Sequence, residues 1–137
     1  MNTLDVVKSL VEQGADTNRQ NGNRSNTTAF MFACYRNHTN TVEYLLSLNN
    51  IQVNLVNVDG WSGFYTACFF GYNSIVQVLL GDAKTDIMLS DENNWSPLMR
   101  AAFWGRTETI KRILSVSEWR RVPDIQQKST KDAGGIK

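Results

Sequence analysis

The feature that most constrains the fold of this chain is a repeat with a period of 34 residues. When the sequence is shifted by 34 positions, apolar residues fall on apolar residues and small residues on small ones. The aligned sets include Phe30, Phe64 and Leu98; Ala33, Ala67 and Ala101; Val42, Val76 and Ile110; and Leu46, Leu80 and Leu114. A fixed period of roughly 20–50 residues is typical of solenoids, in which each unit buries its apolar face against the next. The sequence therefore predicts an array of similar units.

Each unit starts with the pattern of a short helix. Ser96 is a favourable N-cap, because its hydroxyl can accept a hydrogen bond from a free amide of the first turn. Pro97 follows at the first helical position, where its missing N–H costs nothing, and Gly105 can end the helix in the left-handed conformation. The equivalent residues of the earlier units are Thr28 and Ser62 for the cap, and Asn37 and Gly71 for the end.

A second helix and an extended connector complete the unit. Apolar residues continue at helical spacing over residues 41–46, 75–80 and 110–114. The connector at residues 51–60 then ends in Asp59-Gly60, a pair that is typical of a hairpin turn, and residues 86–94 are its counterpart in the next unit. We therefore expect two helices and a β-hairpin in each repeat.

This order of a short helix, a tight turn, a second helix and a β-hairpin resembles the ankyrin repeat. The family pattern Thr-Pro-Leu-His-x-Ala-Ala is similar to residues 28–34, 62–68 and 96–102, and the motif Gly-Ala-Asp-x-Asn stands intact at residues 14–18. The resemblance covers about residues 2–126 and implies an all-α solenoid with β-hairpin connectors. A tetratricopeptide array also repeats every 34 residues, but it joins its helices by short turns and would not contain the hairpin segment.

The sequence departs from the family pattern in four respects. The period is one residue longer than usual, the connector at residues 19–27 is about two residues longer than its counterparts, and Ser117–Asp124 carries an insertion of about four residues. In addition, Met31, Tyr65 and Met99 replace the histidine of the pattern. The Thr–His hydrogen bonds that family members use between repeats cannot form, so we expect apolar packing in their place.

The repeat pattern divides the chain into five segments. They are a partial repeat at 1–26, ankyrin-like repeats at 27–60, 61–94 and 95–126, the last with an insertion in its hairpin, and a tail or truncated repeat at 127–137. Neither end shows the polar capping unit with which repeat arrays normally finish. We therefore expect the chain to be a piece of a longer array.

Composition and motifs argue against several classes of function. A formal net charge of +1 is too small to indicate a nucleic acid or an acidic membrane as the main partner, and no apolar run reaches the roughly 18–20 residues that span a bilayer. The start lacks the pattern of a signal peptide, which favours a cytoplasmic or nuclear location, and we expect a monomer. Cys34 and Cys68 are expected to be buried thiols, and His38 alone cannot complete a metal site with them. Without a phosphate loop or paired catalytic residues, the sequence predicts neither enzyme activity nor a cofactor.

The resemblance implies that another protein binds on a concave face made of hairpin tips and first helices. The residues placed on that face by the family pattern, together with one charged neighbour, are Tyr35, Arg36, Trp61, Phe69, Phe70, Glu92, Trp95, Arg100, Phe103 and Trp104. Aromatic and arginine side chains often supply most of the binding energy of an interface. We therefore predict a non-catalytic interaction scaffold; the alternative is a regulatory fragment of a larger enzyme, channel or microbial effector.

Some of these aromatic residues also have a structural interpretation. Trp61 and Trp95 recur at the same place in successive units and could stack against neighbouring hairpins. Phe69 and Phe103 could fill the space left by the missing histidines. Phe70 and Trp104 are favoured as binding residues, because the second of two consecutive aromatic residues on a helix points away from the first; the polar rim would be supplied by Arg36, Glu92 and Arg100.

Overall fold

The computed structural model of the chain describes residues 3–22 and 25–120. Within these ranges the backbone forms seven α-helices and no strand. The helices are α1 (Thr3–Glu12), α2 (Ala29–Tyr35), α3 (Thr39–Leu46), α4 (Gly63–Phe70), α5 (Asn73–Leu80), α6 (Pro97–Phe103) and α7 (Thr107–Arg120).

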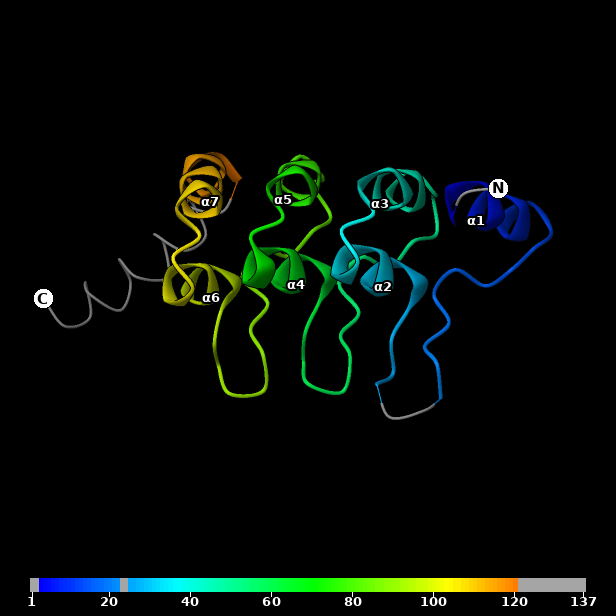
Figure 1. Cartoon of the computed structure of the whole chain (residues 1–137), viewed down its shortest axis with the longest axis horizontal. Coiled ribbons are helices and arrows are strands. Elements are labelled where there is room, and N and C mark those ends of the chain that lie inside the picture. Colours follow the sequence, from blue (N-terminus) through cyan, green and yellow to red (C-terminus); the bar gives the residue numbers. More distant parts are fainter. Residues whose placement is uncertain (1–2, 23–24, 121–137) are drawn as a thin grey trace, which may run out of the picture.

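The helices are arranged in two rows that run along an elongated molecule (Figure 1). The first helices of the units, α2, α4 and α6, form one row, and α1, α3, α5 and α7 form the other. Long loops extend from the row of first helices and connect each unit to the next. This arrangement confirms the expected all-α solenoid of repeated helix pairs.

The first helix of each unit begins and ends where the sequence predicts. The Ser62 hydroxyl accepts a hydrogen bond from the Tyr65 amide at 3.0 Å, and Thr28 and Ser96 make the same cap at α2 and α6. Residues with positive φ follow the helices: Asn37 (60°), Gly71 (71°) and Gly105 (69°). Short local signals therefore set both ends of these helices.

Replacing Ser62 by alanine is expected to lower the free energy of unfolding by about 1 kcal/mol. The change removes the acceptor of the Tyr65 amide, and water cannot replace it because Ser62 is buried. Urea denaturation followed by circular dichroism measures the effect. The control is Ser74→Ala, since Ser74 is exposed on α5; an equal effect of the two changes would contradict a specific role for the cap.

The connectors between units close as turns, and the β-hairpins expected from the sequence are not confirmed. The Asn57 amide donates to the Trp61 carbonyl at 3.0 Å, and Asn57 Oδ1 accepts from the N–H groups of Asp59 and Trp61. Gly60 has a φ of 80°, so the turn predicted at Asp59-Gly60 is present. Because a side-chain oxygen takes amides that a strand ladder would pair, this loop closes without a ladder.

The same closure occurs in the other connectors. Asp91 Oδ1 accepts from the amides of Asn93 and Trp95 at 2.8 and 2.9 Å. In the first connector, Asn21 Oδ1 accepts from the Thr27 amide at 2.6 Å. Asn21 precedes Asn57 by 36 residues, whereas Asn57 precedes Asp91 by 34. The spacing agrees with the two extra residues predicted for the first connector.

The insertion predicted at Ser117–Asp124 begins within a helix. Ser117–Arg120 continue α7, which has 14 residues where α3 and α5 each have eight. The remainder of the predicted insertion lies outside the described residues, as does the segment at 127–137.

One continuous apolar core runs through the units. It is built from the residues that align at the 34-residue spacing, among them Phe30, Phe64, Val42, Val76, Ala67 and Ala101. Cys34 and Cys68 are fully buried, as predicted, and burial raises the pKa of both thiols well above the ordinary value. Successive units contact closely, since a Cβ added at Gly63 would lie 2.6 Å from the Phe30 ring and 2.9 Å from Cys34 Sγ.

Two asparagines also fix the register between units. Asn18 Oδ1 accepts from the Gln52 amide and Asn54 Oδ1 accepts from the Asp86 amide, both at 2.8 Å. Each asparagine also donates through its side-chain amide to a backbone carbonyl of the same neighbouring segment. The connectors are therefore held to one another by polar bonds as well as by the core.

Candidate partner-binding surface

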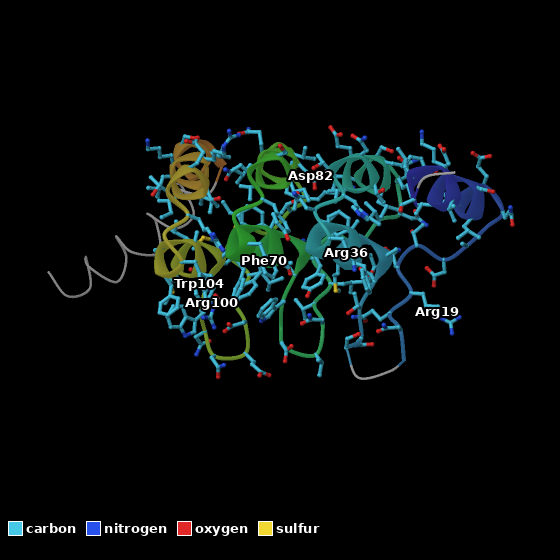
Figure 2. The ribbon with its side chains drawn as sticks, in the orientation of Figure 1. Arg19, Arg36, Phe70, Asp82, Arg100 and Trp104 are labelled. Atoms are coloured by element: carbon cyan, nitrogen blue, oxygen red, sulfur yellow. The ribbon has the colours of Figure 1, made fainter. Side chains whose placement is uncertain are left out.

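The seven aromatic residues predicted for the binding face lie in one continuous set of ring contacts, here called the aromatic surface. Figure 2 labels Phe70 and Trp104 on the row of first helices. The contacts between ring centroids are Tyr35–Phe70 at 5.6 Å, Phe70–Phe69 at 5.0 Å, Phe69–Trp61 at 4.8 Å, Phe69–Trp104 at 5.6 Å, Trp104–Phe103 at 5.0 Å and Phe103–Trp95 at 5.5 Å. Separations of this size are typical of favourable aromatic pairs. Residues from three successive units thus form a single apolar surface.

The members of the aromatic surface differ in exposure. Tyr35, Phe103 and Trp104 are 52%, 60% and 48% exposed, whereas Trp61, Phe69, Phe70 and Trp95 are half-buried. The predicted polar neighbours Arg36 and Glu92 are also exposed. Three large rings of this surface are therefore exposed to solvent.

The structure corrects the interpretation given to two of these rings. Phe103 does not fill the space of a missing histidine, because more than half of its surface is exposed. Trp61 contacts Tyr65 and Phe69 of its own unit. Phe70 is half-buried between Tyr35 and Tyr72. The alternation expected for consecutive aromatic residues therefore exposes Trp104 but not Phe70.

Beneath the rings lies a polar cluster that joins two units, formed by Tyr65, Asp91 and Arg100. The Tyr65 hydroxyl donates to Asp91 Oδ2 at 2.6 Å, and Arg100 Nε donates to the Tyr65 hydroxyl at 2.7 Å. Arg100 Nη2 lies 3.3 Å from the same carboxylate oxygen. Tyr65 occupies the position of the histidine in the family pattern, so the expectation that apolar packing alone would replace it is wrong at this position.

The three groups change one another's protonation. Burial by itself raises the pKa of the Asp91 carboxyl, but hydrogen bonds from Tyr65, the amides of Trp95 and Asn93, and Arg100 outweigh burial, so the net pKa is below its usual value. Burial and the bond to Asp91 raise the pKa of Tyr65 to about 12. Burial by itself lowers the pKa of Arg100, but the hydrogen bonds and charge interactions with Tyr65 and Asp91 raise its pKa overall. The cluster therefore holds a carboxylate, a neutral phenol and a guanidinium at neutral pH.

The cluster also orients part of the aromatic surface. The Arg100 guanidinium lies 4.3 Å from the centroid of the Trp95 ring and 5.8 Å from that of Phe69, within the range of cation–π attraction. The Trp95 backbone amide donates to Asp91. Sequence reasoning placed Arg100 at the rim as a specificity residue, but its charge is used inside the molecule. The signal that was missed is a tyrosine in the histidine position with an arginine 35 residues later.

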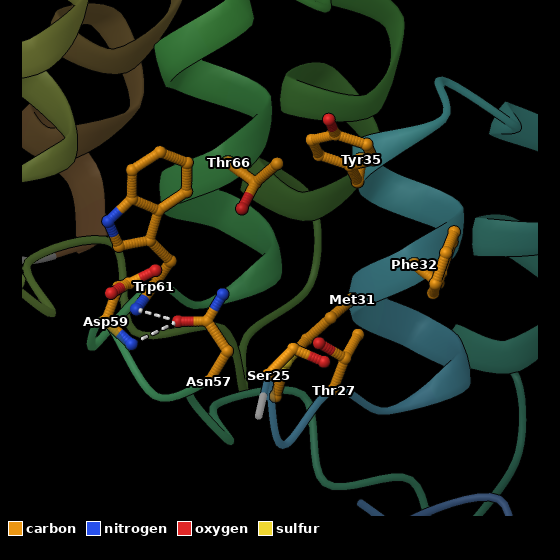
Figure 3. Close-up of a pocket in the computed structure, with 9 residues that line it drawn as sticks. All are labelled: Ser25, Thr27, Met31, Phe32, Tyr35, Asn57, Asp59, Trp61 and Thr66. Atoms are coloured by element: carbon orange, nitrogen blue, oxygen red, sulfur yellow. Dashed lines mark hydrogen bonds between the residues drawn. The ribbon is translucent and has the colours of Figure 1, made fainter. Parts of the chain in front are cut away.

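A pocket of about 270 Å³ is lined by residues of α2, of α4 and of the connectors that precede these two helices (Figure 3). Tyr35 and Trp61 are the two predicted site residues that line it. The other lining residues are Ser25, Thr27, Met31, Phe32, Asn57, Asp59 and Thr66. Figure 3 shows Thr66 between the rings of Tyr35 and Trp61, and Asp59 below Trp61. Sequence reasoning did not find this pocket, because its lining comes from three successive segments of the repeat pattern.

Comparison with known families agrees with the fold. A family model described as "Ankyrin repeats (3 copies)" matches residues 1–91 and again 49–128. The chain belongs to the ankyrin repeat family. Ankyrin repeats are generally modules for protein interaction, and not catalysts. No curated protein sequence matches this ankyrin chain closely enough to count as a relative.

Two further features of the ankyrin array concern metal and membrane binding. In residues 3–22 and 25–120, no three His, Cys, Asp or Glu side chains lie close enough together to hold a metal ion. Across the same ranges, none of the helices has the length and apolar character needed to cross a membrane.

Proposed function

We propose that this ankyrin chain binds another protein through the aromatic surface and performs no catalysis itself. The observation that carries the proposal is the continuous set of seven rings, three of which are about half exposed or more. Soluble proteins seldom expose contiguous apolar surface without using it for contact. Tryptophan and tyrosine are also enriched among the residues whose truncation weakens complexes most.

The support beneath the rings favours a rigid binding surface. The Trp95 backbone amide donates a hydrogen bond to Asp91, and the Arg100 guanidinium lies over the Trp95 ring. Phe69 packs between Trp61 and Trp104. Side chains that are already ordered lose less conformational entropy on binding than mobile ones do. Arg36 and Glu92 are exposed and would form polar contacts at the edge of the same surface.

Replacing Trp104 or Phe103 by alanine is expected to weaken partner binding by about tenfold, the size of a typical anchor residue. Both side chains are exposed, so the variants should keep the parent's fold. The chain is used as bait in a cell extract, the recovered protein is purified, and its affinity for parent and variants is measured by calorimetry.

The matched control is Leu114→Ala. Leu114 is 49% exposed, which is close to Trp104, but it lies on α7 in the other row of helices. Its replacement should leave the affinity unchanged. If Trp104→Ala and Phe103→Ala bind the partner as tightly as the parent while circular dichroism shows them folded, the aromatic surface is not the binding face.

A further inference from the structure

Four residues that line the pocket beside α2 are equivalent to the residues that form the Arg100 site one unit later. The later site is built by the connector residue Asp91, the rings of Trp95 and Phe69, and Arg100 itself. Counting back 34 residues from Asp91, Trp95, Phe69 and Arg100 gives Asn57, Trp61, Tyr35 and Thr66. All four of these residues line the pocket. The earlier site thus keeps the closing residue of the connector and two aromatic rings, but it has a threonine where the later site has an arginine.

The equivalence is structural as well as positional. Asn57 Oδ1 accepts from the amides two and four residues later, as Asp91 Oδ1 does. Trp61 therefore leaves its connector in the same way as Trp95. Thr66 is on the first helix, is 5% exposed, and donates its hydroxyl to the Ser62 carbonyl. Its side chain is short and carries no guanidinium, and a pocket of about 270 Å³ remains beside it.

The pocket also has the charge that a guanidinium requires. In the later site the carboxylate belongs to Asp91, whereas in the earlier site that position is the neutral Asn57. Asp59, two residues further on, is exposed and is the one charged residue among those described in the lining. Its carboxylate has no ion-pair partner within residues 3–22 and 25–120. Apolar contact is provided by Met31 and Phe32.

We propose that this pocket binds one arginine side chain of a partner protein. The inference deepens the proposed function and rests on it. A planar guanidinium can stack on Trp61 and Tyr35 while it donates to the Asp59 carboxylate, as Arg100 stacks on Trp95 and bonds to Asp91. Lysine is a poorer fit, because its ammonium is compact, strongly hydrated and unable to stack. The volume suits one side chain, since pockets for small molecules usually start at about 300 Å³.

The test uses three short peptides as probes: acetyl-Gly-Arg-Gly-amide, the same peptide with citrulline, and the same peptide with lysine. Citrulline has the shape of arginine without the charge. Binding is followed by two-dimensional ¹H–¹⁵N NMR of the full chain, with the indole N–H of Trp61 and the amides of Asn57 and Asp59 as reporters. The arginine peptide should shift these signals to saturation, the lysine peptide should bind more weakly, and the citrulline peptide should not bind. An equal response to arginine and to either other peptide would overturn the proposal.

Two variants test the site itself. Asp59→Asn removes an exposed charge without changing the core and should lower the affinity for the arginine peptide by about fivefold. The control is Glu43→Gln, which removes an exposed acid on α3 that does not line the pocket and should have no effect. Thr66→Arg supplies a guanidinium from the chain, as in the later unit, and should abolish the response of a variant that thermal denaturation shows to be folded. If Asp59→Asn binds the arginine peptide like the parent, the pocket is not an arginine site.

The outcome is separable from that of the proposed function. Phe103 and Trp104 do not line the pocket, so alanine at either position should leave binding of the arginine peptide unchanged. If the peptide fails to bind while the captured partner still depends on Trp104, the arginine site is wrong and the aromatic surface remains. If Thr66→Arg and Asp59→Asn affect the peptide as expected but Trp104→Ala leaves the partner unaffected, the aromatic surface is wrong.

Discussion

Replacing Asp91 by alanine is expected to lower the free energy of unfolding by about 3 kcal/mol. The side chain is almost fully buried and accepts from the Tyr65 hydroxyl, from Arg100 and from the amides of Asn93 and Trp95. Alanine would leave all of these donors without their acceptor, and would leave Arg100 with its charge uncompensated. Removing one partner of a buried pair costs more than the pair itself contributes, because the remaining charge is poorly solvated.

Asp91→Asn separates the two roles of this carboxylate. Asn57 stands at the equivalent position one unit earlier, and its side chain closes the connector by accepting the same two hydrogen bonds from backbone amides. Asparagine at 91 should therefore keep the turn but lose the negative charge beside Arg100. We expect its cost to be roughly half that of alanine, as measured by urea denaturation at neutral pH. If asparagine and alanine cost the same, charge and not turn closure accounts for the effect.

The pH dependence gives an independent measurement. The pKa of Asp91 is lowered in the folded chain, so its contribution to stability is fully present above the unfolded value of about 3.9. The contribution declines as the pH falls through the lower, folded pKa. The difference in unfolding free energy between the parent and Asp91→Asn should therefore be constant near neutral pH and shrink in acid. A difference that stays constant down to acidic pH would show that the charge of Asp91 does not stabilise the fold.

The sequence predicted the parts of the fold that depend on neighbouring residues. The caps at Thr28, Ser62 and Ser96 each act within three residues, and the turn at Asp59-Gly60 is equally local. The 34-residue period then placed these local units in the right order. The connectors were expected to be strands because the turn signal is shared by hairpins and by loops closed through an asparagine or aspartate side chain. The direction of the Asn57 Oδ1 atom decides whether a hairpin or a side-chain-closed loop is formed. The sequence pattern does not contain that information.

The site was predicted less completely, because its chemistry depends on contacts between units. The aromatic residues were identified from their positions in the repeat, and they do lie together. Arg100 looked like an exposed rim residue, yet its charge is taken up by Asp91 and Tyr65, which are 9 and 35 residues away. The exposure of Phe103 and the burial of Phe70 likewise depend on their surroundings, since Phe70 packs against rings of both its own and the preceding unit. Contacts between side chains of different units can be identified only from the three-dimensional structure. The repeat pattern alone shows which positions are equivalent.

Replacing Gly60 by alanine is expected to lower the free energy of unfolding by about 2–3 kcal/mol, more than the same change at Gly105. Both glycines have positive φ, at 80° and 69°, so each alanine pays about 1 kcal/mol for the left-handed conformation. At Gly105 the added Cβ would meet nothing within 4 Å, whereas at Gly60 it would lie 2.9 Å from the Glu92 amide nitrogen. That contact is with backbone, which cannot rotate away as a side chain can.

Gly60→Asn and Gly105→Asn should avoid most of the free-energy cost of the left-handed conformation. Asparagine tolerates positive φ, and Asn26 and Asn94 of this chain already adopt it. The difference between the two glycine positions should therefore persist with asparagine, as measured by thermal and urea denaturation. Equal losses at both positions would show that the connectors do not pack as closely as 2.9 Å implies. Gly60 lies between Asp59 and Trp61, so a shift of this connector should also move two walls of the pocket. Gly60→Ala should then lower the affinity for the arginine peptide, and Gly105→Ala should leave it unchanged. The reason is that the position of this connector sets the distance between the Asp59 carboxylate and the rings of the pocket.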